Sequence, residues 1–171
     1  MPASQPEPWL RNSHTELPVV VRAVTHALEH AKEDIDHWCG QLSQEQLEAQ
    51  PHNLPSAAFQ MRHIAGSLDR LLAYAEGNVL STEQLKHLKA EADPGRSKEA
   101  SFIAFHEAIA HSLARVANFI HSNPEEKRTV GRAQLPVTLG DLLVHIAEHT
   151  QRHVGQAITT TKVLLHSAQT D

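Results

Sequence analysis

Four long stretches of the chain repeat apolar residues at helical spacing, and this periodicity constrains the fold more than any other feature. The stretches span residues 17–39, 56–76, 97–122 and 138–168. Apolar side chains that recur every three or four residues share one face of a helix, and that face needs a partner surface. Four such helices bury one another's faces in a bundle. We predict an all-α protein, a four-helix bundle with long crossover connections.

The connecting segments carry the signals expected at helix ends. Ser43 and Ser81 each precede a Gln by three residues, which is a capping-box pattern and predicts two short helices in the connections. Residues 125–136 form a polar connector that can fold as a short hairpin around Gly131. Residues 1–16 hold three prolines and few apolar side chains, so we expect a loosely ordered lead-in to one domain that spans the whole chain.

Composition excludes several classes of protein. The 171 residues carry 15 Lys and Arg against 20 Asp and Glu, so no basic excess is available to bind nucleic acid. Cys39 is the only cysteine, which excludes an intramolecular disulfide and a cysteine-based zinc finger. We find neither a secretion signal nor an apolar run that could span a membrane, and we therefore expect a cytoplasmic protein.

Histidine is far more frequent than in ordinary proteins, with 14 in the chain. Three of these, His145, His149 and His153, follow one another at intervals of four in the last predicted helix. A step of four residues turns a helix by about 40° and advances it by about 6 Å, so the three rings form one ribbon. Imidazole is the commonest metal ligand, and two rings at this spacing can bind one ion.

The apolar stripe of the same helix distinguishes between the three rings. His149 and His153 lie at the edge of the stripe, whereas His145 is turned furthest toward water. We therefore predict His149 and His153 as metal ligands and His145 as a surface or supporting residue. Gln156 lies close to both predicted ligands, where it would orient a ring or a bound water, or simply be a surface amide.

A metal site of useful affinity needs a third protein ligand from another helix. His63 is the best candidate because it lies off the apolar stripe of its helix, although periodicity alone does not favour it over His106 or His111. Tyr74, the only tyrosine, is expected to line either the cleft or the core. The alternative is that the histidines are incidental to a helix that happens to be rich in them.

Three other residues receive structural predictions. We expect Asp69 and Arg70 to form an ion pair, and Gly155 to allow close packing between helices. No arrangement of residues identifies a nucleophile or a general base, so no catalytic residue is assigned.

Two segments make the sequence similar to a known family. They are PSAAFQMRHIAGSLDRLLAYAEG and, some 65 residues later, LGDLLVHIAEHTQRHVGQ. Together they resemble the DinB/YfiT-like superfamily of bacterial four-helix proteins. The resemblance implies an up-down-down-up order of helices, frequent homodimers, and one divalent metal ion, often nickel or zinc. It implies His63, His149 and His153 as the three ligands of that ion.

Characterised members of this superfamily include thiol S-transferases that use bacillithiol or mycothiol, and maleylpyruvate isomerases. The resemblance therefore implies a metal-dependent enzyme, of the thiol S-transferase or hydrolase kind, that activates a thiol or a water. Its partner would be a small-molecule substrate, with a low-molecular-weight thiol as the candidate. The alternative is a non-catalytic metal-binding or stress-associated dimeric bundle, since a fold does not determine a reaction.

Overall fold

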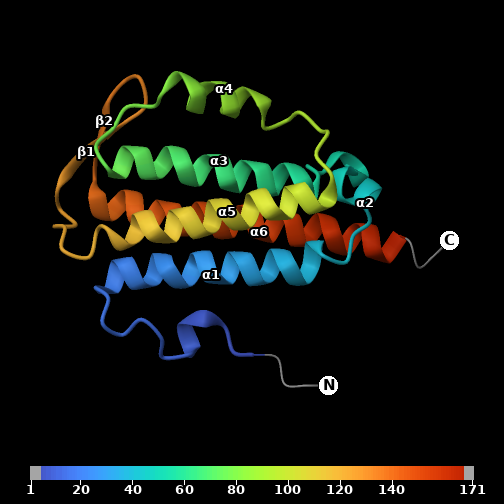
Figure 1. Cartoon of the computed structure of the whole chain (residues 1–171), viewed down its shortest axis with the longest axis horizontal. Coiled ribbons are helices and arrows are strands. Elements are labelled where there is room, and N and C mark those ends of the chain that lie inside the picture. The colour runs from blue at the N-terminus through green and yellow to red at the C-terminus, as the bar shows by residue number, and fades with distance from the viewer. Residues whose placement is uncertain (1–4, 168–171) are drawn as a thin grey trace.

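The computed structural model describes residues 5–167 and contains the expected four long helices. They are α1 (Val19–Cys39), α3 (Ala57–Ala75), α5 (Lys98–Ala117) and α6 (Leu139–Ser167). Each of α1 and α3 packs against both α5 and α6. Helices α1 and α6 run in one direction and α3 and α5 in the other, so the order is up-down-down-up (Figure 1). The predicted all-α bundle with long crossovers is confirmed.

The core is formed by the apolar stripes that the sequence displays. Leu28 and Ile35 of α1, Ile64 of α3 and Ile146 of α6 have no exposed surface. Each aliphatic side chain buried in this way contributes roughly 1.5–3 kcal/mol relative to an exposed one. Helical periodicity therefore places the core, and the faces that remain outside it carry the polar and histidine side chains.

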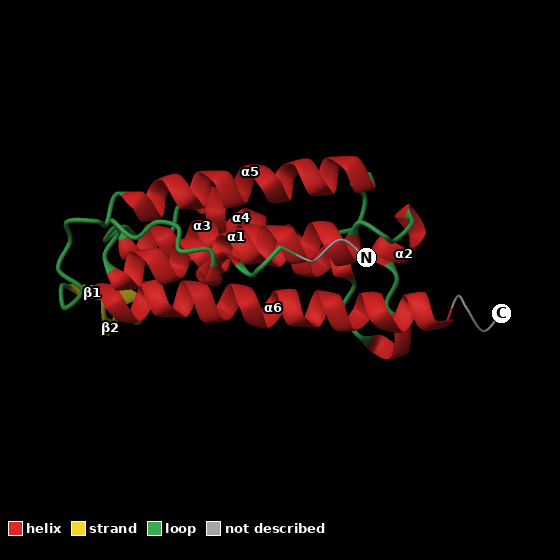
Figure 2. Cartoon of the chain, turned by 90° about the horizontal axis from the view of Figure 1, so that it is seen from below, coloured by secondary structure: helices red, strands yellow, loops and turns green. Residues whose placement is uncertain are grey.

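The crossovers contain the short elements. They are η1 (Pro8–Leu10), α2 (Gln44–Glu48), η2 (Pro51–Asn53), α4 (Thr82–Ala90), β1 (Lys127–Val130) and β2 (Leu135–Thr138). Both predicted capping boxes are present, at Ser43 and at Ser81. The strands pair antiparallel around Gly131, whose φ of +74° favours glycine in the turn. This confirms the hairpin, which lies at the end of the bundle where α6 begins (Figure 2).

The end predicted for the third long helix differs from the structure. Helix α5 ends at Ala117 rather than near residue 122, because the chain tightens there into a turn in which the Phe119 amide donates to the Val116 carbonyl. The Phe119 ring lies in this turn and is still buried in the core, so the helix does not have to continue in order to bury it. The predicted end of the last helix at residue 168 lies outside the described residues.

The lead-in is less loose than expected from its composition. Pro8 is buried in η1, and the Arg11 guanidinium forms a bidentate ion pair with Glu33 of α1 at 2.6 Å. Trp9 and Leu10 remain more than half exposed. The buried proline, the Arg11–Glu33 ion pair, and contacts of Ser13 and His14 with side chains of α1 therefore attach this segment to the bundle.

Helix α4 lies along the outside of α3 and belongs to the long crossover between α3 and α5 (Figure 1). It buries none of its own side chains, but the residue that follows it, Glu91, is only 8% exposed. The crossover is therefore attached within α4 by the Gln84 amide, which donates to Asp69 of α3, and at its end by the buried Glu91. Within residues 5–167, no helix combines the length and the apolar character that crossing a membrane requires.

Candidate metal centre

Three histidines that are distant in sequence meet between α3 and α6. The ring centroids of His63 and His153 are 4.2 Å apart, those of His149 and His153 4.5 Å, and those of His63 and His149 5.2 Å. Each residue offers one ring nitrogen as a ligand atom, and these three nitrogens all lie within 4.8 Å of one another. The three rings can therefore hold one metal ion, and they are the three residues that the family resemblance implies as ligands.

The position of two of these rings follows from the packing of α6. Ile146, Val154 and Ala157 are buried in the core, and His149 and His153 lie at the edge of that buried face. His145 lies outside the cluster: its side chain is 43% exposed, and its Nδ1 lies 2.8 Å from a Glu148 carboxylate oxygen. The helical face argument thus separates the clustered pair from the surface histidine.

His63 reaches the cluster from α3 and is held on two sides. Its ring stacks on Phe59, with the centroids 5.7 Å apart and the planes 17° from parallel. Its Nδ1 donates to the Glu91 carboxylate over 2.9 Å. Of the two alternative candidates, His106 instead pairs with Asp36 on α1, and His111 is exposed on α5. The third ring is therefore set by a residue that arrives from the crossover after α4.

Sequence reasoning did not identify Glu91, although one signal in the sequence was available. Gly66 lies one turn after His63, and a Cβ atom at this position would overlap the Glu91 carboxylate and crowd Arg70. A glycine in the interior of a helix is unfavourable by about 1 kcal/mol relative to alanine, so it marks a place where something must approach closely.

The charge of Glu91 is stabilised by two partners. Burial alone would raise its pKa, but hydrogen bonds from His63 and Arg70 and the charge of Arg70 outweigh burial and hold the pKa below its ordinary value. The expected ion pair between Asp69 and Arg70 is wrong. Arg70 turns inward to Glu91, whereas Asp69 pairs with Arg115 of α5, because adjacent residues on a helix point about 100° apart.

A second buried contact orients His153. Its Nδ1 lies 2.7 Å from Oε1 of Gln60, and Gln60 is fully buried in α3. The Gln60 amide nitrogen in turn donates to Oε1 of Gln156 over 2.8 Å. Gln156 therefore supports His153 through Gln60 rather than by direct contact, and Gln60 is the supporting residue that the periodic pattern missed.

These contacts leave the right nitrogens for a metal ion. An ionised Glu91 only accepts hydrogen bonds, so His63 carries its proton on Nδ1, and the amide orientation of Gln60 places the His153 proton on Nδ1 as well. The Nε2 lone pairs of His63 and His153 therefore remain available. Nδ1 of His149 is buried without a hydrogen-bond partner in the described structure. The donor set fits a divalent ion, which binds neutral imidazole.

The rings on α6 are also in the protonation state that a ligand needs. Burial, followed by the mutual repulsion that the clustered rings would feel if charged, lowers the pKa of His149 to about 4. Burial, followed by the repulsion that the clustered His63 ring would exert if charged, likewise lowers the pKa of His153 to about 4. Both rings are therefore neutral at pH 7, and no proton has to leave them before an ion binds.

Three other candidate residues do not contribute to the cluster. Tyr74 packs partly buried against the core, about 16 Å along α3 from His63 at the rise of a helix. Gly155 does not allow close packing as predicted, because a Cβ atom there would meet nothing within 4 Å. Cys39 is fully buried beside Thr161, and burial raises the pKa of its thiol, so it is not a reactive nucleophile.

Comparison with known proteins agrees with the fold and the cluster. The family model of the DinB superfamily matches residues 27–157, a range that includes all three clustered histidines and Glu91. No curated protein and no solved structure matches the chain. The family match covers most of the chain and joins the two segments that carry the histidines. This chain therefore belongs to the DinB superfamily.

Proposed function

We propose that this protein is a metal-dependent enzyme that binds one divalent ion, zinc or nickel, through His63, His149 and His153. We further propose that it acts as a thiol S-transferase, with a low-molecular-weight thiol as one substrate. The observation that carries the proposal is the convergence of three imidazoles from two helices within ligand distance of one point. Membership of the DinB superfamily supports it.

The residues of the chain supply orientation and protonation. Glu91 and Gln60 hold the Nδ1 protons of His63 and His153, and so fix which nitrogen of each ring faces the cluster. Three neutral imidazoles do not cancel the charge of a divalent ion. An ion held there would lower the pKa of a thiol or a water and make either one a nucleophile near neutral pH.

Both zinc and nickel suit imidazole ligands, so the donor set supports either metal. We also propose that the enzyme is a cytoplasmic homodimer, on the strength of its family.

Metal binding is tested on protein made without a histidine tag. Elemental analysis should find about one divalent ion per chain in the wild type. His63→Ala and His149→Ala should each lose at least 100-fold in affinity, because two rings remain where three are needed. His121→Ala is the matched control, since His121 is exposed in the turn that follows α5, and it should bind the ion as the wild type does.

Turnover is tested by following consumption of bacillithiol, mycothiol or glutathione in the presence of 1-chloro-2,4-dinitrobenzene. The thiol sulfur displaces chloride from the aromatic ring, and the thiol proton leaves to solvent. We expect the reaction in the metal-loaded wild type and not in His149→Ala. One bound ion per chain without turnover of any thiol would contradict the enzyme proposal and support the non-catalytic metal-binding alternative.

A further inference from the structure

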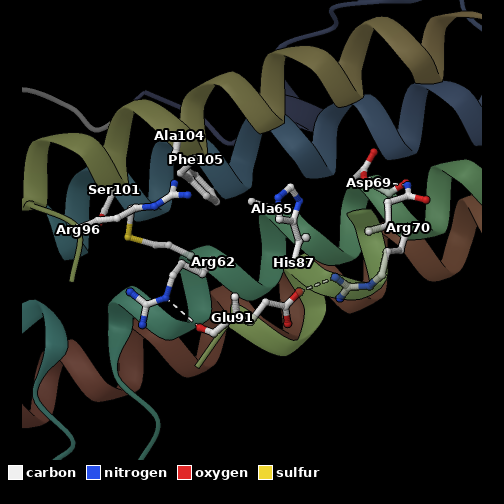
Figure 3. Close-up of a pocket in the computed structure, with 14 residues that line it drawn as sticks. Arg62, Ala65, Asp69, Arg70, His87, Glu91, Arg96, Ser101, Ala104 and Phe105 are labelled. Atoms are coloured by element: carbon white, nitrogen blue, oxygen red, sulfur yellow. Dashed lines mark hydrogen bonds and ion pairs between the residues drawn. The ribbon is translucent and has the colours of Figure 1, made fainter. Parts of the chain in front are cut away.

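A cavity of about 310 Å³ lies between α3, α5 and the crossover that contains α4 (Figure 3). None of the three clustered histidines lines it. Glu91 separates the two sites: its carboxylate contacts His63 on one side and Arg70, which lines the cavity, on the other. The cavity is therefore a distinct space that shares one wall with the candidate metal centre.

One end of the cavity combines apolar walls with two polar groups. Met61 and Ala65 line it from α3, and Ala104 and Phe105 line it from α5. Figure 3 shows Ser101 and Arg96 at the same end, with the Arg96 guanidinium turned toward Phe105. A ligand in this space would contact hydrocarbon and aromatic surface along its body and a cation at its head.

The hydroxyl of Ser101 points to a missing ligand. Ser101 is 5% exposed, and its Oγ is buried without a hydrogen-bond partner in the described structure. Buried hydroxyls are almost always satisfied, and leaving one unpaired costs about 1–3 kcal/mol. A polar atom of a bound molecule in the cavity would supply that partner.

The charges around the cavity are satisfied, with one exception. Arg62 pairs with Glu48, and Arg70 pairs with Glu91. The Asp69 carboxylate is bound by Arg115 and by the Gln84 amide. Among the described residues, the guanidinium of Arg96 has no ion-pair or hydrogen-bond partner. Arg96 is exposed, so its guanidinium is a solvated cation at the edge of the cavity, and one negative charge on a bound ligand would pair with it.

We propose that this cavity binds a small organic monocarboxylate. Its carboxylate pairs with the Arg96 guanidinium and accepts a hydrogen bond from the Ser101 hydroxyl, while its apolar body packs against Met61 and Phe105. The single unpaired guanidinium favours a monoanion over a phosphate dianion, which is usually bound by several cations or by a cluster of backbone amides.

The volume sets the size of the ligand. Since a water molecule occupies about 30 Å³, the cavity holds roughly ten non-hydrogen atoms. Phenylacetate has this size, one negative charge and a flat apolar body. Ligands of this size bind in the millimolar range or more tightly at ordinary efficiencies.

The proposal is tested by titrating phenylacetate into chelator-treated protein and following backbone amide resonances. We expect saturable shifts at residues that line the cavity, such as Gly66, Ser101 and Ala104. Arg96→Gln should weaken binding about tenfold or more, and Ser101→Ala severalfold, because each removes a contact with the carboxylate. Arg132→Gln, in the exposed turn of the hairpin, is the matched control and should leave the affinity unchanged.

Two further comparisons separate this site from the metal centre. Phenylacetamide, the neutral isostere, and acetate, which lacks the apolar body, should both bind at least tenfold more weakly than phenylacetate. His149→Ala should bind phenylacetate as the wild type does, whether or not the protein proves to hold a metal. Equal binding of the acid and the amide, loss of binding in His149→Ala, or no saturable shifts at the cavity would overturn the proposal.

Discussion

Helix α6 and the α4 crossover each contribute to the candidate metal centre, but different forces hold them in place. Helix α6 contributes His149 and His153 and is anchored by fully buried apolar side chains such as Ile146. Helix α4 has no fully buried side chain. The crossover contributes Glu91, which is held by a hydrogen bond with His63 and by an ion pair with Arg70. One half of the site rests on hydrophobic packing and the other on a buried polar network.

This difference indicates how each half should respond to change. Hydrophobic burial is spread over many contacts and tolerates changes of pH and salt. A buried ionic network depends on every member, because removing one leaves a charge without its partner. The packed half should therefore govern the stability of the whole chain, and the polar half should govern the affinity and orientation of the site.

The largest effect should come from removing packing from α6. Ile146→Ala should lower the free energy of unfolding by about 2–4 kcal/mol, since it leaves a cavity in the core. Leu88→Ala is the matched change in α4, where the side chain is 42% exposed, and it should alter stability by less than about 0.5 kcal/mol. Urea unfolding of the metal-free protein measures both. Similar losses in the two variants would show that α4 is packed as firmly as α6.

The next effect concerns the polar half. Glu91→Gln keeps the shape of the side chain but removes the charge that His63 and Arg70 share. We expect the affinity for the divalent ion to fall about 10- to 100-fold, as is usual when the partner of a ligand is changed. A competition titration with a chelator measures this.

Glu83→Gln serves as the control for that change. Glu83 lies on the exposed side of α4, and its side chain is 63% exposed. It should bind the ion with wild-type affinity. If Glu91→Gln also retained that affinity, the carboxylate would have no part in orienting His63.

The same two regions show what the sequence could and could not predict. The pair on α6 was predictable because periodicity within one helix fixes which side chains share a face, and His149, His153 and the surface residue His145 all lie in one segment. The third ring could not be predicted in this way, because His63 lies on another helix and meets His149 and His153 only after the helices pack. Periodicity left His63, His106 and His111 as equals, and the family resemblance separated them.

The supporting residues were harder still to predict. Glu91 follows an exposed helix in an irregular segment, and nothing in its immediate sequence predicts that it is buried. Gln60 appears in the sequence as a polar residue on an amphipathic helix, yet it is fully buried between two other polar side chains. Both positions are determined by long-range packing, whereas Gly66 records the approach of Glu91 only indirectly.

The smallest predicted effect is on the pH dependence of stability, in which the histidines of α6 and the Glu91 network should lose their contributions over different pH ranges. His149 and His153 have a pKa of about 4 in the folded protein against about 6.5 when unfolded. As pH falls from 6.5 toward 4, the unfolded chain takes up protons that the folded chain does not, so the folded state loses stability. The Glu91 pKa lies below its ordinary value, so the contribution of Glu91 is present above about pH 4.5 and is lost only at lower pH.

The metal-free wild type should therefore lose about 1–2 kcal/mol between pH 7 and pH 4.5 that His149→Gln/His153→Gln does not lose, a figure reduced because both rings are partly exposed to solvent. Urea unfolding at the two pH values provides the comparison. Parallel losses in the two proteins would mean that the rings on α6 titrate normally. In that case the packing of α6 would place the rings without keeping them neutral, and ion binding near pH 6 would have to displace protons from them.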